Sequence, residues 1–175
     1  MTIRTETWPV AADASGLYLL GAEAWRTVLP VQADTGPHAD VLLELARHDI
    51  LEDRDLLEIH STSWGPAGQI FLVTYYAAVD CDGPVLARWP DAQPITLDAA
   101  RAVGRAPSHG GLEAPVPRHF DVLMHALRHM RFRLDADADC AAIYAHRPLW
   151  RQHLQVLEPA LAEMYGGHWT LPRAA

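Results

Sequence analysis

The most constraining feature of the sequence is a pair of adjacent β-prone segments, LLEIHSTSW (residues 56–64) and QIFLVTYYAAV (69–79), joined by the turn-forming GPAG (65–68). This pattern predicts a hairpin. Side chains of the second segment alternate between two faces, with Ile70, Leu72, Thr74 and Tyr76 on one and Phe71, Val73 and Tyr75 on the other. Because both faces are largely apolar, the segment is predicted to be a central strand covered by helices on either side.

Two shorter segments predict further strands. LYLL (17–20) and AWRTVLPV (24–31) are apolar-rich runs bounded by glycine and proline. Together with the hairpin they favour an α+β fold, a mixed sheet with helices on both faces. A chain of 175 residues with 50% hydrophobic content buries one substantial core, so residues 1–175 are predicted to form a single domain.

The C-terminal part, about residues 95–166, is predicted to be helical. Thr96 is suited to cap a short helix over 97–103. A longer helix is predicted over 118–134, with a core stripe of Phe120, Leu123, Met124, Leu127, Met130 and Leu134. A last helix over 150–164 is predicted to be kinked at its proline, with a stripe of Trp150, Leu154, Leu157, Leu161 and Met164.

Charge and composition exclude several kinds of function. The net charge of −8 argues against general nucleic-acid binding, which needs a basic surface. Residues 99–134 differ from this average, because six arginines against two carboxylates give them a surplus of +4. No run of about 20 apolar residues and no secretory signal pattern is present, so we expect a cytoplasmic protein without a membrane span. Cys81 and Cys140 are expected to be plain thiols.

The chain contains no lysine and no asparagine. A P-loop needs a lysine at the phosphates, and a pyridoxal cofactor needs one for its Schiff base. Protein kinases need both a lysine and a catalytic-loop asparagine. These three chemistries are therefore excluded.

A helix predicted over GPHADVLLELARHDI (36–50) carries the strongest candidate site. One face is apolar, formed by Val41, Leu42, Leu45 and Ala46. Side chains three and four residues apart meet on a second, polar face, formed by Asp40, Glu44, Arg47 and His48. This second face is either a metal or general-base site, or a solvated surface with intrahelical ion pairs.

The order of elements around this helix resembles the core of the Nudix hydrolase superfamily. A strand, a Leu29-Pro30 step, a glycine-containing loop, the helix and the hairpin follow one another over about residues 16–82. In that family, glutamates of a helical box bind Mg²⁺ beside a substrate diphosphate. Aligning Glu44 with the arginine–glutamate pair of the box places Arg47 and His48 where paired glutamates belong. Arginine does not coordinate Mg²⁺, which prefers oxygen ligands.

This departure gives the leading hypothesis. The chain is expected to be a Nudix-like domain that has lost metal-dependent diphosphate hydrolysis and acts as a ligand-binding or regulatory domain without a cofactor. The expected ligand is a small anionic or nucleotide-like molecule in a cleft beside Glu44 and His48. Asp40, Arg47 and Arg128 are the further candidate contacts.

Two alternatives stay open. The first is an active hydrolase of nucleoside diphosphate-linked compounds, with Mg²⁺ or Mn²⁺ held by Asp40, Glu44 and either Glu52 or Asp53. The second is an interaction protein that buries the apolar stripe of the helix over 150–164 against a partner, with a homodimer as one form.

Three smaller features receive simple structural interpretations. Asp139 is expected to cap a helix. His125 and His129 have the spacing of a helical metal pair, but the pattern points them away from the apolar stripe and predicts that they are exposed. His60, in the first hairpin strand, lacks an identifiable orienting acid for nucleophilic chemistry.

Overall fold

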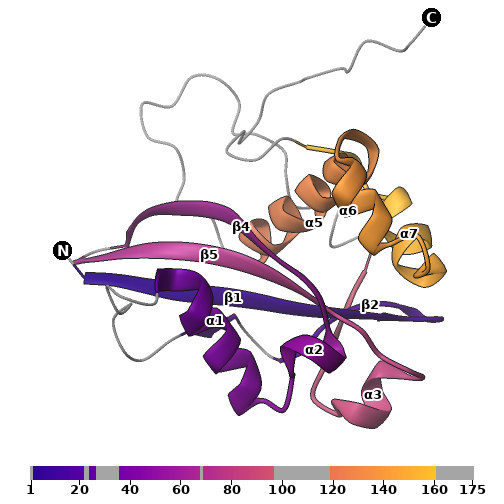
Figure 1. Cartoon of the computed structure of the whole chain (residues 1–175), viewed down its shortest axis with the longest axis horizontal. Coiled ribbons are helices and arrows are strands. Elements are labelled where there is room, and N and C mark those ends of the chain that lie inside the picture. The colour runs from indigo at the N-terminus through magenta and orange to yellow at the C-terminus, as the bar shows by residue number, and fades with distance from the viewer. Residues whose placement is uncertain (1, 22–23, 27–35, 68, 97–118, 161–175) are drawn as a thin grey trace, which may run out of the picture.

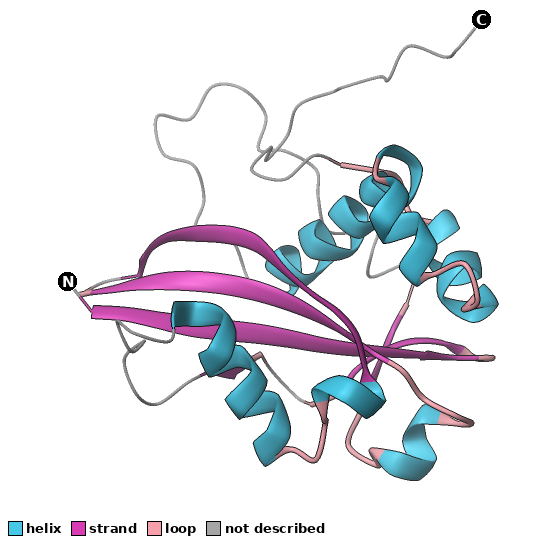
Figure 2. Ribbon diagram, viewed as in Figure 1, coloured by secondary structure: helices cyan, strands magenta, loops and turns pink. Residues whose placement is uncertain are grey.

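The computed structural model of the protein describes residues 2–21, 24–26, 36–67, 69–96 and 119–160. These residues form one sheet with helices on both faces (Figures 1 and 2). The strands are β1 (Thr2–Asp13), β2 (Gly16–Leu19), β3 (Trp25–Arg26), β4 (Leu56–Ala67), β5 (Ile70–Val79) and β6 (Gln93–Ile95). The helices are α1 (Gly36–Arg47), α2 (Glu52–Asp55), α3 (Val85–Arg88), α5 (His119–Ala136), α6 (Ala138–Ile143) and α7 (Pro148–Gln155).

The sheet is mixed, with the strand order β4-β5-β1-β2-β6 and β3 paired with β1. β1 and β5 run parallel, from Thr2 opposite Ile70 to Ala11 opposite Val79, and the other pairs are antiparallel. The predicted hairpin is therefore confirmed as β4 and β5. Its turn is shorter than predicted, because β4 continues to Ala67 and pairs there with Ile70.

Side chains of the central strands alternate between the two faces of the sheet and pack into a separate hydrophobic core on each face. Trp8 and Tyr76 pack on the face covered by α5, α6 and α7. Ala11 and Tyr75 pack on the opposite face, where α1 and α3 contribute Val41 and Val85. The predicted α+β class with helices on both faces is confirmed. The more specific likeness to a Nudix sandwich stays a prediction.

The strand β1, which is as long as β4, was not predicted. Its buried residues include Thr5, Glu6 and Thr7, which give no apolar alternation, and Pro9, which normally argues against a central strand. Pro9 lies where β1 changes its antiparallel partner, since Thr7 pairs with β3 and Val10 pairs with β2. A missing backbone donor costs little at a position where the ladder is already interrupted.

The C-terminal helices follow the predicted stripe more closely than the predicted boundaries. Leu123, Met124, Leu127 and Met130 are fully buried under α5, as predicted. The single kinked helix is wrong, because α7 ends at Gln155. The predicted cap Asp139 is also wrong: the carboxylate of Asp137 caps α6 by accepting hydrogen bonds from the backbone N–H groups of Asp139 and Cys140.

Parts of the sequence prediction lie outside the described residues. They are the helix predicted over 97–103, residues 27–31 of the strand predicted over 24–31, and residues 161–164 of the helix predicted over 150–164. Among the helices that the structure describes, none combines the length and the apolar character needed to cross a bilayer.

Candidate functional site

A cavity of about 370 Å³ opens beside the end of β5. The carboxyl ends of parallel strands, here β1 and β5, are a common place for ligand sites in α/β sheets. We call this cavity the end cleft. It is lined by two short helices and the connection from β5 to α3, through Arg54, Asp55, Ala87 and Arg88 and through Asp80, Cys81, Asp82 and Pro84.

Local backbone features hold α2 and α3 around the end cleft. Asp49 adopts a φ of 58° just after α1, so the chain turns sharply toward α2. Gly83 has a φ of 109°, which L side chains rarely adopt, so the turn into α3 requires glycine. The carboxylate of Asp13, at the end of β1, accepts a 2.8 Å hydrogen bond from the N–H of Val85 and fixes the start of α3.

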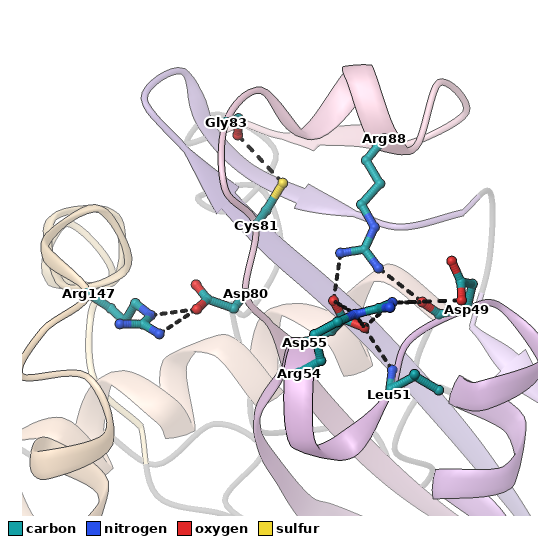
Figure 3. Close-up of polar contacts among 9 residues, drawn as sticks. All are labelled: Asp49, Leu51, Arg54, Asp55, Asp80, Cys81, Gly83, Arg88 and Arg147. Carbon is teal, nitrogen blue, oxygen red and sulfur yellow. Dashed lines mark hydrogen bonds and ion pairs between the residues drawn. The ribbon is translucent and has the colours of Figure 1, made fainter.

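Asp55 forms the floor of the end cleft and is almost fully buried (Figure 3). Its carboxylate accepts hydrogen bonds from Arg54 Nε at 3.0 Å and from Arg88 Nη1 at 2.9 Å. The N–H of Leu51 adds a bond of 2.9 Å. Burial raises the pKa of Asp55, but these bonds outweigh it and hold the pKa well below its usual range. Asp55 is therefore an anion that orients two guanidinium groups.

Both arginines keep donors for a ligand. Each also donates to the carbonyl oxygen of Asp49, Arg88 at 3.0 Å and Arg54 at 3.3 Å. Arg88 lies over the ring of Trp89, 4.3 Å from its centroid. Within the described residues, Arg54 Nη1 and Arg88 Nε have no hydrogen-bond partner. The Arg54 side chain is 55% exposed and the Arg88 side chain 33% exposed.

The opposite wall of the end cleft is acidic. One oxygen of Asp80 accepts a 2.8 Å hydrogen bond from Arg147, at the start of α7 (Figure 3). The thiol of Cys81 donates to the carbonyl of Gly83 at 3.5 Å. Burial raises the pKa of Cys81, so the thiol stays protonated at neutral pH and is a poor nucleophile. Asp82 is exposed and completes the wall.

The end cleft is thus suited to binding and has two poles. Among the lining residues, two arginines against Asp55 leave one positive charge on the helical side, which the exposed Asp49, with Oδ1 3.7 Å from Arg54 Nη2, partly offsets. On the connection side Arg147 neutralises Asp80, so Asp82 leaves one negative charge. The protonated thiol provides no activated nucleophile.

The structure brings three of the predicted α1 residues together. Glu44 contacts Arg47 Nη1 at 2.8 Å and His48 Nε2 at 3.5 Å. His48 also stacks on Trp25, with ring centroids 3.8 Å apart. Asp40 lies one turn earlier, and its Oδ2 is buried with no hydrogen-bond partner among the described residues. The described residues include no group of three His, Cys, Asp or Glu side chains arranged to hold a metal ion.

The predicted cleft shared by Glu44, His48 and Arg128 is wrong. α1 packs against Ala11 and its neighbours on one face of the sheet, whereas α5, which carries Arg128, packs on the other. Arg128 instead donates to the carbonyl oxygen of Glu158 at 2.9 Å. The sheet separates the two predicted halves, and sequence spacing gave no information on which face each helix covers.

The prediction of exposed histidines on α5 is also wrong. His129 is 8% exposed, and its Nε2 lies 3.2 Å from Nε2 of His60 on β4. Beside them, Arg133 forms an ion pair with the buried Glu58, which also accepts a 3.2 Å hydrogen bond from the hydroxyl of Tyr144. This buried polar cluster joins β4 to α5 and α6, and no sequence motif indicated it.

In comparisons with known proteins, the chain matches no protein-family model, no curated protein and no solved structure. Its function is therefore inferred from the geometry of the site.

Proposed function

We propose that the protein is a ligand-binding domain of Nudix-like architecture that captures the carboxylate or phosphate of a small molecule in the end cleft. The observation that carries this proposal is the convergence of Arg54 and Arg88 on the buried carboxylate of Asp55. Guanidinium groups recognise carboxylates and phosphates through paired N–H donors. Here a fixed anion holds two of them at the cavity, and each keeps one nitrogen that no described residue uses.

The state of α1 supports binding over diphosphate hydrolysis. Glu44 aligns with one carboxylate of the Nudix-like box, and it is occupied by Arg47 and His48. A cation that already pairs with a carboxylate competes with a metal for the same oxygens. At a position where the box of the family has a glutamate, Arg47 therefore brings a positive charge.

The experiment measures binding of acetate, inorganic phosphate and a nucleoside monophosphate by calorimetry. Arg54→Gln should weaken binding of the anion about tenfold or more, because the variant loses a charge-assisted hydrogen bond to it. Ala87→Trp fills the end cleft without changing its charges and should abolish binding. Ala46→Trp, at an exposed position on α1, is the matched control. Binding that survives Ala87→Trp, or no binding of any probe, contradicts the proposal.

One observation favours a second candidate function, metal-dependent hydrolysis of nucleoside diphosphate-linked compounds. The buried, unpartnered Oδ2 of Asp40 lies one turn before Glu44, and a buried carboxylate oxygen without a partner is the kind of group that a cation satisfies. The test is product release with Mg²⁺, with Mn²⁺ and with chelator. Turnover that is lost in Glu44→Gln and kept in Asp91→Asn, an exposed control, would establish this function.

A further inference from the structure

The end cleft is bipolar, and this property narrows the ligand beyond a simple anion. Its positive pole is formed by Arg54 and Arg88 around Asp55. Its negative pole is formed by Asp80 and Asp82, on the connection between β5 and α3. Both poles line one cavity, so a ligand that fills the cavity meets both.

The negative pole has accepting capacity to spare. Both contacts from Arg147 go to Oδ2 of Asp80, and within the described residues Oδ1 has no hydrogen-bond partner. Asp82 is exposed and carries a charge that no ion pair among those residues neutralises. A ligand with only negative charge would gain from the arginines but would be repelled by this wall.

The size and the remaining lining also limit the ligand. A volume of about 370 Å³ lies at the small end of the range for ligand sites, about 300–1,000 Å³. Pro84 and Ala87 add small apolar surfaces to the lining. A compact molecule with a short apolar part fits these dimensions better than a nucleotide.

We propose that the end cleft binds a small zwitterion of the free amino acid type, with its carboxylate on Arg54 and Arg88 and its ammonium group on Asp80 and Asp82. This inference rests on the proposed function, because it assigns the anionic part of the ligand to the same two arginines. It adds a second recognition element, the ammonium group, and so predicts that neither half of the ligand suffices.

The experiment uses the full chain and pools of α-amino acids and short ω-amino acids as probes. Each binder is compared with its N-acetyl derivative, which keeps only the negative charge, and with its amide, which keeps only the positive charge. Calorimetry should show that each derivative binds at least tenfold more weakly, since each loses one charge-assisted contact. A second readout is alkylation of Cys81, which lines the end cleft, with the fully buried Cys140 as internal reference. A bound zwitterion should slow alkylation of Cys81.

Asp82→Asn tests the negative pole at an exposed position where folding is not at risk. It should weaken the amino acid about tenfold and leave the N-acetyl derivative unaffected or tighter. Asp91→Asn, equally exposed but outside the cleft, should change neither. If the N-acetyl derivative binds as well as the amino acid and needs Arg54, the zwitterion inference fails while the proposed anion binding stands. If no probe binds or protects Cys81, the zwitterion inference fails, and both fail if acetate, phosphate and the nucleoside monophosphate also do not bind.

Discussion

Replacing Arg133 with methionine should destabilise the protein far more than the loss of a surface arginine. Arg133 on α5 is 15% exposed, and it pairs with Glu58 on β4, whose side chain is 7% exposed. Methionine keeps an apolar chain of similar length but leaves the Glu58 carboxylate with only the Tyr144 hydroxyl, 3.2 Å away, as a strong hydrogen-bond donor among the described residues. The substitution therefore buries a charge without a countercharge.

The expected magnitude follows from this burial. Removing one partner of a buried ion pair costs about 3–5 kcal/mol of the free energy of unfolding. The pair between Arg133 and the more exposed Asp137 adds little. Burial raises the pKa of Glu58 above its ordinary value, although Arg133 opposes this rise. Without Arg133 the pKa of Glu58 rises further, so the folded variant takes up a proton more readily than the unfolded chain. The cost is then largest at neutral pH and shrinks as the pH falls toward the ordinary value for glutamate.

The assay is urea denaturation at about pH 7 and about pH 5. With an m-value of about 2 kcal/mol/M, the midpoint of Arg133→Met should fall by about 1.5–2.5 M at the higher pH and by less at the lower one. The double variant Glu58→Gln with Arg133→Met should recover much of the loss, and Arg151→Met, an exposed position on α7, should cost almost nothing. A cost below about 1 kcal/mol, or the same cost at both pH values, would refute the reasoning.

Three further predictions follow from other parts of the structure. Burial and a nearby arginine lower the pKa of His60 from 6.5 to about 4. The free energy of unfolding should therefore fall as the pH drops through this interval, by about 1–2 kcal/mol after allowance for partial exposure. Urea denaturation across that range should show a weaker dependence of this free energy on pH for His60→Gln. Asp137→Ala should lower the melting temperature by a few degrees through loss of the α6 cap, whereas an equal effect of Asp139→Ala would contradict the assigned cap. Alkylation of the native protein followed by peptide mass analysis should find Cys81 modified and Cys140 unmodified, because burial raises the pKa of Cys140 to about 12 and leaves it no exposed surface.

The elements that could be predicted are those in which apolar residues recur with the spacing of a strand or a helix. The two-sided pattern of residues 69–79 gave the central strand β5, and the stripe through Leu123, Leu127 and Met130 gave α5. β1 was missed because Thr5 and Thr7 are polar residues that the tertiary structure buries, and a local pattern does not reveal that burial. Strand order was equally hidden, since the parallel pairing of β1 with β5 joins segments more than fifty residues apart.

The candidate site was less predictable than the fold. LEDRD (51–55) reads as a solvated acidic turn, yet Asp55 is buried because Arg88, from a separate helix, covers it. Three of the four residues predicted to share the polar face of α1, namely Glu44, Arg47 and His48, are in contact, and the intrahelical pairs from Glu44 were one of the two interpretations considered. Arg128 was misplaced because helical periodicity fixes which residues share a face, but not which face of the sheet that helix covers.

Asp13 at the end of β1 and Asp80 just after β5 also determine how a structural change at the end cleft would reach the rest of the protein. The Asp13 carboxylate holds the start of α3, and its carbonyl oxygen lies 2.8 Å from Nε2 of His153 on α7. Asp80 donates its backbone N–H to the carbonyl oxygen of Asp55, and its carboxylate accepts from Arg147. Each of these aspartates therefore connects the helices on one face of the sheet to the helices on the other face through hydrogen bonds. A molecule that shifts α3 would pull on α7 through backbone and side-chain bonds, and the two layers at this end should open to hydrogen exchange as one cooperative unit.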